Sequence, residues 1–183
     1  MEVKMRKEQY QVPEVQFQFR ENGQFVTRTT SELFNGKRVV IFSLPGAFTP
    51  TCSAYQLPGF EEKYDDFLGL GIDDIYCISV NDGFVMNAWA KDQDIEKVTL
   101  IPDGNAYFTR SMGMLVNKSN LGFGDRSWRY AAVVDNGIIE KLFVEAGQRD
   151  NADTDPYEVS TPENVFEYVK TTVRETAKAL QTV

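Results

Sequence analysis

Two apolar runs of strand length constrain the fold of this chain more than any other feature of its sequence. Arg38–Leu44 and Asp74–Val80 are rich in β-branched and aromatic residues, and such nearly continuous apolar runs are typical of strands buried on both faces of a sheet. Each run precedes a segment predicted to be helical, Pro50–Leu68 and Asp82–Lys91, the first with an expected kink at Pro58. This alternation predicts an α/β fold with parallel strands at the centre of the sheet.

Further strands and helices complete the pattern. An Asn-Gly dipeptide at 22–23 and another at 136–137 each separate two strand-like segments, as in β-hairpins. Ser160, with Glu163 three residues later, predicts a capping box at the start of the last helix. We expect a mixed central sheet with helices on both faces and an N-terminal β-hairpin. The additional elements are strands at Val15–Arg20, Gln24–Thr29, Lys97–Ile101, Arg129–Val134 and Ile138–Val144, a helical turn at Ser31–Phe34, and a helix at Ser160–Leu180.

Length and charge limit the class of protein. The 183 residues fit one domain, and no linker-like stretch divides them, so a single domain over 1–183 is expected. The net charge of −8 argues against nucleic acid or an anionic membrane as the main partner. No apolar run approaches the roughly 20 residues that span a bilayer, and the polar N-terminus lacks the apolar core of a signal peptide. Cytoplasmic residence is therefore the expectation.

The absence of histidine narrows the chemistry. The chain has no histidine and only two cysteines, Cys52 and Cys77. Without histidine, neither a Ser-His-Asp triad nor a Cys-His pair can form. Zinc sites that contain histidine are excluded, and two cysteines cannot supply four thiolates. We therefore predict no metal site and no bound cofactor, and any activated nucleophile must be activated by another group.

The segment from Leu44 to Cys52 connects a central strand to a helix, where sites gather in open α/β sheets. Thr49 followed by Pro50 is typical of an N-cap and a first helical residue. This assignment places Cys52 in the first helical turn, where unpaired backbone N–H groups and the helix dipole favour a thiolate.

The helix terminus alone is too weak to activate a thiol. Lowering the pKa of a cysteine from about 8.5 to about 6 requires about 3.4 kcal/mol, whereas a helix dipole supplies about 2 kcal/mol at best. Since histidine is absent, the remaining charge must come from Arg or Lys. The local spacing of these residues does not distinguish an activated Cys52 from a buried structural cysteine at a helix start.

A series of motifs extends this local signal over most of the chain. The stretch Pro45-x-x-x-Thr49-x-x-Cys52 matches the active-site signature of the peroxiredoxin family, and the run from Pro45 to Ser53 resembles its type-5 subfamily, which includes proteins fused to a glutaredoxin domain. The resemblance covers roughly residues 12–170. The other matching segments are Leu57–Phe60, Ser79–Asp82, Phe84–Trp89, Ile101–Asn105, Gly113–Met114 and Arg126–Tyr130.

The resemblance implies a thioredoxin-like fold and a thiol-dependent peroxidase that reduces hydrogen peroxide and organic hydroperoxides in antioxidant defence. Cys52 matches the peroxidatic cysteine, and Thr49 matches the hydroxyl that bonds the peroxide oxygens. Arg129 matches the arginine that stabilises the thiolate and polarises the peroxide, and Pro45 matches the residue that shields the thiolate from water. Arg126 is a competing candidate for the arginine.

Two features depart from the family pattern or leave alternatives open. Gln56 stands four residues after Cys52, where many relatives have histidine, so a proton-transfer role for that position is in doubt. Cys77 lies in a predicted buried strand and is either a small hydrophobic residue or a resolving thiol. No cysteine follows the Arg129 region, where some relatives carry a resolving thiol, so the chain resembles the one-cysteine kind.

The resemblance also predicts partners. The sequence ends soon after the matched region, so we expect an external reductant: glutathione with glutaredoxin, or thioredoxin. A homodimer is expected because Phe84, Trp89 and Met112–Leu115 fall in segments that resemble the family's dimer surface; alternatively, they pack in the core of the monomer.

Three other classes of protein were weighed. A dithiol–disulfide oxidoreductase would need a Cys-x-x-Cys motif, which Cys52 does not have. A redox sensor or holdase needs the same reactive cysteine as a peroxidase but would react once and stall. In an acidic binding module without catalytic activity, Cys52 would be oxidised no faster than a free thiol.

Overall fold

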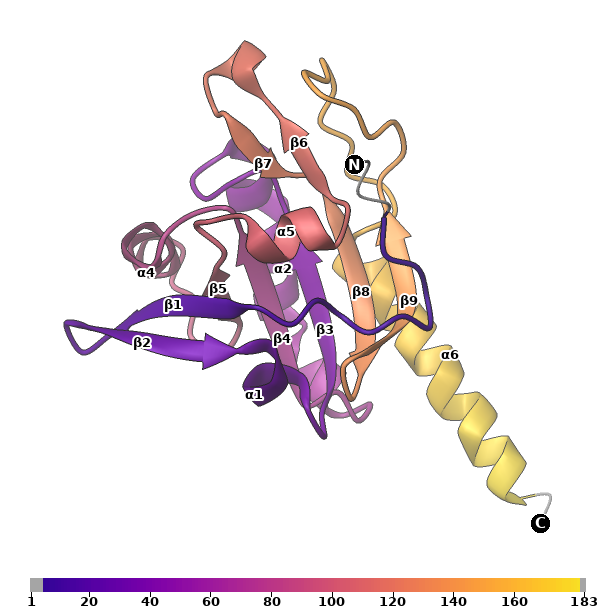
Figure 1. The fold of residues 1–183 in the computed structure, drawn as a ribbon. Helices are drawn as coiled ribbons and strands as arrows, with labels where there is room; N and C mark the ends of the chain where they lie inside the picture. Colours follow the sequence, from indigo (N-terminus) through magenta and orange to yellow (C-terminus); the bar gives the residue numbers. More distant parts are fainter. Residues whose placement is uncertain (1–4, 182–183) are drawn as a thin grey trace.

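The computed structural model describes residues 5–181, with the side chains of 174–181 outside the description. Strands and helices alternate through the middle of the chain, as predicted (Figure 1). The strands are β1 (Gln16–Glu21), β2 (Gln24–Thr29), β3 (Arg38–Ser43), β4 (Asp74–Ser79), β5 (Thr99–Pro102), β6 (Leu115–Asn117), β7 (Asp125–Ser127), β8 (Tyr130–Asp135) and β9 (Ile138–Val144). The helices are α1 (Thr30–Phe34), α2 (Leu57–Glu62), α3 (Tyr64–Leu68), α4 (Gly83–Asp92), α5 (Tyr107–Ser111) and α6 (Pro162–Gln181), with a π-helical turn η1 (Cys52–Gln56) and a 3-10 turn η2 (Ser119–Leu121).

Five strands form the central sheet in the order β5-β4-β3-β8-β9. β3 pairs in parallel with β4, and β4 with β5, whereas β8 runs antiparallel to both β3 and β9. The predicted mixed sheet is therefore confirmed, with the two apolar runs at its centre. The N-terminal hairpin β1–β2 is also confirmed and forms a separate two-stranded sheet beside the central one (Figure 1).

Side chains of β3 alternate between two apolar layers, because successive residues of a strand point to opposite faces. Val40 and Phe42 belong to a cluster built with α2, α3, α4 and α6, whereas Val39 and Ile41 belong to a cluster built with β1, α1 and α5. All four are fully buried. The expectation of helices on both faces is confirmed, although the second face is covered by a strand and two five-residue helices.

The predicted helix over Pro50–Leu68 is interrupted twice. The first interruption is η1, where the amide of Leu57 donates to the carbonyl of Cys52, five residues earlier. Pro58 follows directly and has no N–H to donate to the preceding turn, which accounts for a distortion just before the proline. The irregular turn lies directly before the proline at which a kink was expected, and the kink itself stays a prediction. A second interruption at Lys63 separates α2 from α3 and was not predicted.

The predicted capping box at α6 is wrong. The hydroxyl of Ser160 donates to the carboxylate of Glu145 at 2.9 Å, and Thr161 caps the helix by accepting the amide of Asn164 at 3.2 Å. Pro162 is the first helical residue, as expected for proline.

The short elements that were not predicted are helix α5, the hairpin β6–β7 and the 3-10 turn η2. Helix α5 has five residues and the hairpin strands have three each, which is too short for a periodic signal. The carboxylate of Asp103 holds the start of α5 by accepting the amides of Phe108 and Thr109 at 3.2 and 2.8 Å. Burial raises the pKa of Asp103, and these hydrogen bonds act in the opposite direction.

Within residues 5–181, no helix is both long enough and apolar enough to cross a membrane. The assignment of residues 1–183 to a single domain stays a prediction.

Candidate active site

Cys52 lies at the carboxyl end of the central sheet, at the first residue of η1. The chain leaves β3 at Ser43, and the segment 44–49 leads into the helix. The amide of Ser53 donates to the carbonyl of Thr49 at 3.0 Å, so the helix begins at Pro50 and Cys52 lies in its first turn, as predicted. The Cys52 side chain is fully buried, so any reaction at its sulfur takes place out of bulk water.

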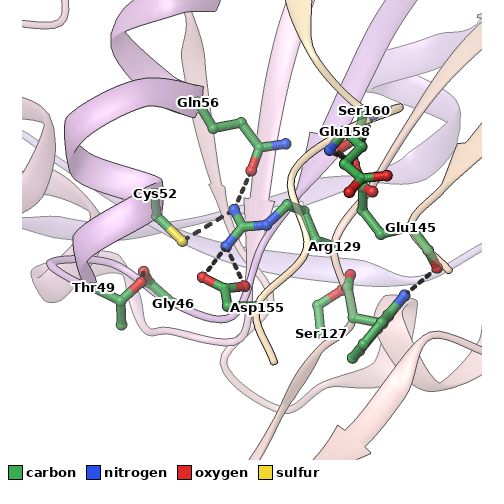
Figure 2. Close-up of polar contacts among 11 residues, drawn as sticks. Gly46, Thr49, Cys52, Gln56, Ser127, Arg129, Glu145, Asp155, Glu158 and Ser160 are labelled. Atoms are coloured by element: carbon green, nitrogen blue, oxygen red, sulfur yellow. Dashed lines mark hydrogen bonds and ion pairs between the residues drawn. The ribbon is translucent and has the colours of Figure 1, made fainter. Parts of the chain in front are cut away.

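Arg129 is the residue that contacts the sulfur of Cys52. Its Nη1 donates to Cys52 Sγ at 3.5 Å and also to Oε1 of Gln56, while its Nη2 donates to both carboxylate oxygens of Asp155 at 2.6 and 2.8 Å (Figure 2). The Arg129 side chain is fully buried, and its three partners come from two parts of the chain, the turn η1 and the loop that carries Asp155.

Strand register explains why Arg129 reaches this position. β8 pairs with β3 so that Tyr130 lies opposite Ser43, the last residue of β3. The residue before Tyr130 therefore lies next to the start of the segment that carries Cys52. The pairing of two strands far apart in the sequence thus brings arginine and cysteine together.

The negative charges around Arg129 keep it protonated. Burial alone would lower the pKa of Arg129, but the charges of Cys52 and Asp155 raise it above its ordinary value. The guanidinium therefore carries a permanent positive charge beside the thiol. A charge-assisted hydrogen bond of this kind is about twice as strong as a neutral one, and a helix dipole alone does not provide it.

Arg126, the competing candidate, occupies a different place. Its Nη1 donates to the carbonyl of Pro45 at 3.3 Å and its Nε to the carbonyl of Phe123 at 3.1 Å. Burial lowers the pKa of Arg126, and the charge of Cys52 acts in the opposite direction. Arg126 thus braces the segment before Cys52, whereas Arg129 contacts the sulfur.

The segment that carries Pro45 and Thr49 makes a tight turn beside Cys52 (Figure 2). The hydroxyl of Thr49 donates to the carbonyl of Gly46 at 2.7 Å, and Pro45 is buried. Gly46 has φ +154°, and a side chain there would collide with Nη1 of Arg126. Phe48 has φ +63°, an uncommon conformation for a bulky residue. The turn is therefore held in a strained shape by its surroundings.

Neighbouring strands and helices supply that support. The side-chain carbonyl of Asn81, just after β4, accepts the amide of Ala47 at 3.0 Å and the hydroxyl of Ser79 at 2.6 Å. The indole of Trp89 donates to the hydroxyl of Ser53 at 2.9 Å. These hydrogen bonds fix the chain on both sides of Cys52.

The sequence did not identify Asp155 and assigned no contact to Gln56. Gln56 could be connected to the site only by its place four residues after Cys52, which brings it to the same helical turn. Asp155 lies in the loop between β9 and α6, 26 residues after Arg129, and no local pattern marks it. Among the described residues, the amide nitrogen of Gln56 and Nε of Arg129 are buried without a hydrogen-bond partner.

Cys77 is a buried thiol in β4, paired in register with Phe42 of β3. Burial raises the pKa of Cys77 well above its ordinary value, and the neighbouring charge of Cys52 raises it further. Within residues 5–181, both cysteines are free thiols, and no cluster of three or more Cys, Asp or Glu side chains could hold a metal ion.

The comparisons with known proteins agree with this site. A family model described as Redoxin matches residues 7–158. A peroxiredoxin of Rhizobium etli is 62% identical over 143 residues, which are 78% of this chain and 80% of that protein. The hybrid peroxiredoxin hyPrx5 of Haemophilus influenzae is 51% identical over 158 residues, 86% of this chain and 64% of that protein. The crystal structure of the Plasmodium falciparum antioxidant protein, a 1-Cys peroxiredoxin, has a TM-score of 0.87 at 47% identity and covers 91% of this chain and 99% of its own.

Fold and site together define a thioredoxin-like α/β protein with a buried cysteine held against an arginine, the arrangement of a thiol-based redox enzyme. The chain belongs to the peroxiredoxin family, in its type-5 group, and it is a thiol peroxidase. The resemblance seen in the sequence motifs is thereby confirmed.

Replacing Gly46 by alanine tests the bracing of the turn. Gly46→Ala places a methyl group against Arg126 in an unfavourable backbone conformation, so we expect a loss of about 1–3 kcal/mol in the free energy of unfolding, measured by denaturant titration. Gly122→Ala is the matched control, because Gly122 also has positive φ, +71°, but open space around it. Part of the loss should be recovered in an Arg126→Ala background. Equal losses in both glycine variants would show that Arg126 does not restrict the turn.

Proposed function

We propose that Cys52 is the nucleophile of this peroxidase, that it reduces hydrogen peroxide and organic hydroperoxides, and that glutathione with glutaredoxin regenerates it. The observation that carries this proposal is the 3.5 Å contact between Arg129 Nη1 and Cys52 Sγ in a fully buried site. A buried cation beside a thiol favours the thiolate, which is the nucleophilic form.

The reaction follows from this geometry. The thiolate of Cys52 attacks one peroxide oxygen, an S–O bond forms and the O–O bond breaks. The leaving oxygen departs as hydroxide or alkoxide and takes up a proton to give water or an alcohol, while Cys52 becomes a sulfenic acid. Negative charge passes from sulfur to the leaving oxygen, and the fixed N–H groups of Arg129 stabilise it throughout that movement.

Thr49 and Pro45 complete the proposed peroxide site. The Thr49 hydroxyl donates to the carbonyl of Gly46, and its oxygen can accept a hydrogen bond from the hydroperoxide. Pro45 is buried and has no N–H group, so it helps exclude water from the sulfur. Gln56 accepts from Arg129, and its amide cannot transfer a proton at neutral pH, so its proposed part is to orient the guanidinium.

An external thiol fits the recycling step better than Cys77 does. A sulfenic acid condenses with a thiol to a disulfide and water, and a second thiol then releases the reduced enzyme. The raised pKa of Cys77 makes it a poor attacking thiol. The similarity to a 1-Cys peroxiredoxin and to a hybrid peroxiredoxin supports an external reductant, and glutathione with glutaredoxin is the pair we propose.

We also propose a homodimer, with a correction to the residues first considered for its surface. Trp89, Met112 and Met114 are fully buried in the protomer and cannot form a dimer surface. Phe84 is 57% exposed, and its ring packs edge-on against the exposed ring of Phe25, with centroids 5.9 Å apart. Exposed aromatic rings of this kind are typical of interaction surfaces.

Replacing Arg129 tests the activation of Cys52. Arg129→Met keeps the bulk and removes the charge, so the rate constant for Cys52 oxidation by hydrogen peroxide should fall by about 10²-fold or more, the effect of losing one transition-state donor. Stopped-flow mixing of reduced enzyme with excess peroxide measures this rate. Arg126→Met is the matched control and should lose less, and Cys52→Ser should abolish turnover. A larger loss in Arg126→Met would show that Arg126, rather than Arg129, activates Cys52. Turnover by Cys52→Ser would refute Cys52 as the nucleophile.

Replacing Cys77 tests the recycling step. Cys77→Ser should keep most of the turnover with glutathione, glutaredoxin and a coupled NADPH assay, because Cys77 takes no part in the reaction. Mass spectrometry of the wild-type enzyme after one equivalent of peroxide, without added thiol, should show a sulfenic adduct on Cys52. A stoichiometric Cys52–Cys77 disulfide would instead identify Cys77 as the resolving thiol.

Sedimentation velocity tests the dimer. At micromolar concentration we expect a species of twice the 20.8 kDa chain mass. Phe84→Asp should shift it towards the monomer, because a charge would be desolvated in the interface. Tyr10→Asp, at another aromatic residue with 54% exposure, is the control and should leave the dimer intact. A wild-type enzyme that sediments only as a monomer would exclude a stable dimer.

A further inference from the structure

We propose that Asp155 is a positioning residue of the peroxidase site, which holds the Arg129 guanidinium in the orientation that presents Nη1 to Cys52. This inference rests on the proposed roles of Cys52 and Arg129. Asp155 lies in the loop between β9 and α6 over residues 145–161, called here the 145–161 loop, to which no sequence motif assigned a function.

Asp155 and Gln56 hold the two ends of one rigid group. Both carboxylate oxygens of Asp155 accept from Nη2 of Arg129, at 2.6 and 2.8 Å, and Oε1 of Gln56 accepts from Nη1 (Figure 2). Because a guanidinium is planar and its N–H groups have fixed directions, anchoring both terminal nitrogens fixes the whole plane. The direction of the N–H bond towards Cys52 follows from these two anchors.

The charge of Asp155 matters because Arg129 is buried. The Arg129 side chain has no exposed surface, whereas that of Asp155 is 44% exposed. A buried cation is costly without a partner of opposite charge. Cys52 supplies such a charge only as a thiolate and loses it on becoming a sulfenic acid. The ion pair with Asp155 does not involve the sulfur, so it can hold Arg129 in place when the charge on sulfur is lost.

The residues that follow Asp155 make its position rigid. Pro156 comes next and restricts the backbone of Asp155 to extended conformations. The ring of Tyr157 then lies against the guanidinium, with its centroid 5.7 Å from Cζ of Arg129. Burial raises the pKa of Tyr157 to about 12, so this ring stays neutral beside the cation at physiological pH. Asp155 and Tyr157, on either side of Pro156, therefore both contact the guanidinium of Arg129.

Both ends of the 145–161 loop are tied to the site. At its start, the amide of Glu145 donates to the carbonyl of Arg129 at 3.2 Å. Near its end, Oε1 of the buried Glu145 side chain accepts the hydroxyl of Ser160 at 2.9 Å. The same oxygen accepts three consecutive backbone amides, those of Glu158, Val159 and Ser160, each at 2.9 Å. The loop thus starts beside the backbone of Arg129 and contacts its side chain again at Asp155. The carboxylate of Glu145 joins the two ends of the loop.

A second ion pair of the same loop provides a contrast. Asp153, two residues before Asp155, pairs with Arg149, and the two side chains are 82% and 54% exposed. An exposed pair of this kind contributes little. Asp153 therefore serves as a matched control, because it is the same residue type on the same loop but pairs with an exposed arginine instead of Arg129.

A double-mutant cycle separates positioning from a structural effect. The measured quantity is the rate constant for Cys52 oxidation by excess hydrogen peroxide, in the full-length protein, for Asp155→Ala, Asp155→Asn and Asp153→Ala. Each is made with Arg129 present and in the Arg129→Met background. We expect Asp155→Ala to lose about 10-fold or more, the effect of a misplaced catalytic group, and Asp155→Asn, which keeps one acceptor oxygen, to lose about threefold. In the Arg129→Met background both losses should disappear, because Asp155 then has nothing to orient.

Every outcome decides the question. A rate for Asp155→Ala that is unchanged or increased, or a loss of equal size with and without Arg129, would overturn the inference. So would an equal loss in Asp153→Ala. Thermal unfolding checks that each variant is folded; if Asp155→Ala is not, the cycle with Asp155→Asn decides. Failure of the proposed function looks different, because Cys52→Ser would then retain turnover or Arg129→Met would retain its rate.

Discussion

The buried guanidinium of Arg129 is the interaction on which the rest of the site depends. Arg129 directly precedes strand β8. Its side chain joins this strand to the helical turn that carries Cys52 and Gln56 and to the loop that carries Asp155. A buried cation without partners would destabilise the fold, so these contacts stabilise the protein and shape its active site at the same time. The geometry around the sulfur of Cys52 is therefore a consequence of the contacts that the buried Arg129 cation requires.

The absence of histidine gives this site a particular electrostatic character. Histidine changes its charge near neutral pH, whereas arginine does not. The negative charges of Cys52 and Asp155 raise the pKa of Arg129 further, against the effect of burial. The positive charge beside Cys52 is thus constant over the physiological pH range. Gln56 contributes a neutral acceptor for this cation without adding a titrating group.

Much of the fold was predictable because its signals are local. The apolar runs of β3 and β4, both Asn-Gly hairpins and the helix α4 follow from strand and helix periodicity within short windows. The failures arose where a distant partner decides the local structure. Ser160 has the sequence of a helix cap, but its hydroxyl is taken by Glu145, fifteen residues earlier. Asp155 has no local signature at all, since its partner Arg129 is 26 residues away.

The sequence by itself determined where Cys52 lies and what kind of charged group can stand beside it. A strand, a short turn and a helix start place Cys52 at the edge of the sheet, and the lack of histidine leaves Arg or Lys as the source of charge. Only the tertiary structure decided between Arg126 and Arg129. The two are three residues apart, but the antiparallel register that pairs Tyr130 with Ser43 brings Arg129 to the sulfur, while Arg126, in β7, lies against the carbonyl of Pro45. Strand register is set by which side chains each strand buries on the two faces of the sheet. The residues that decide it are spread over the entire chain, so no short motif reveals it.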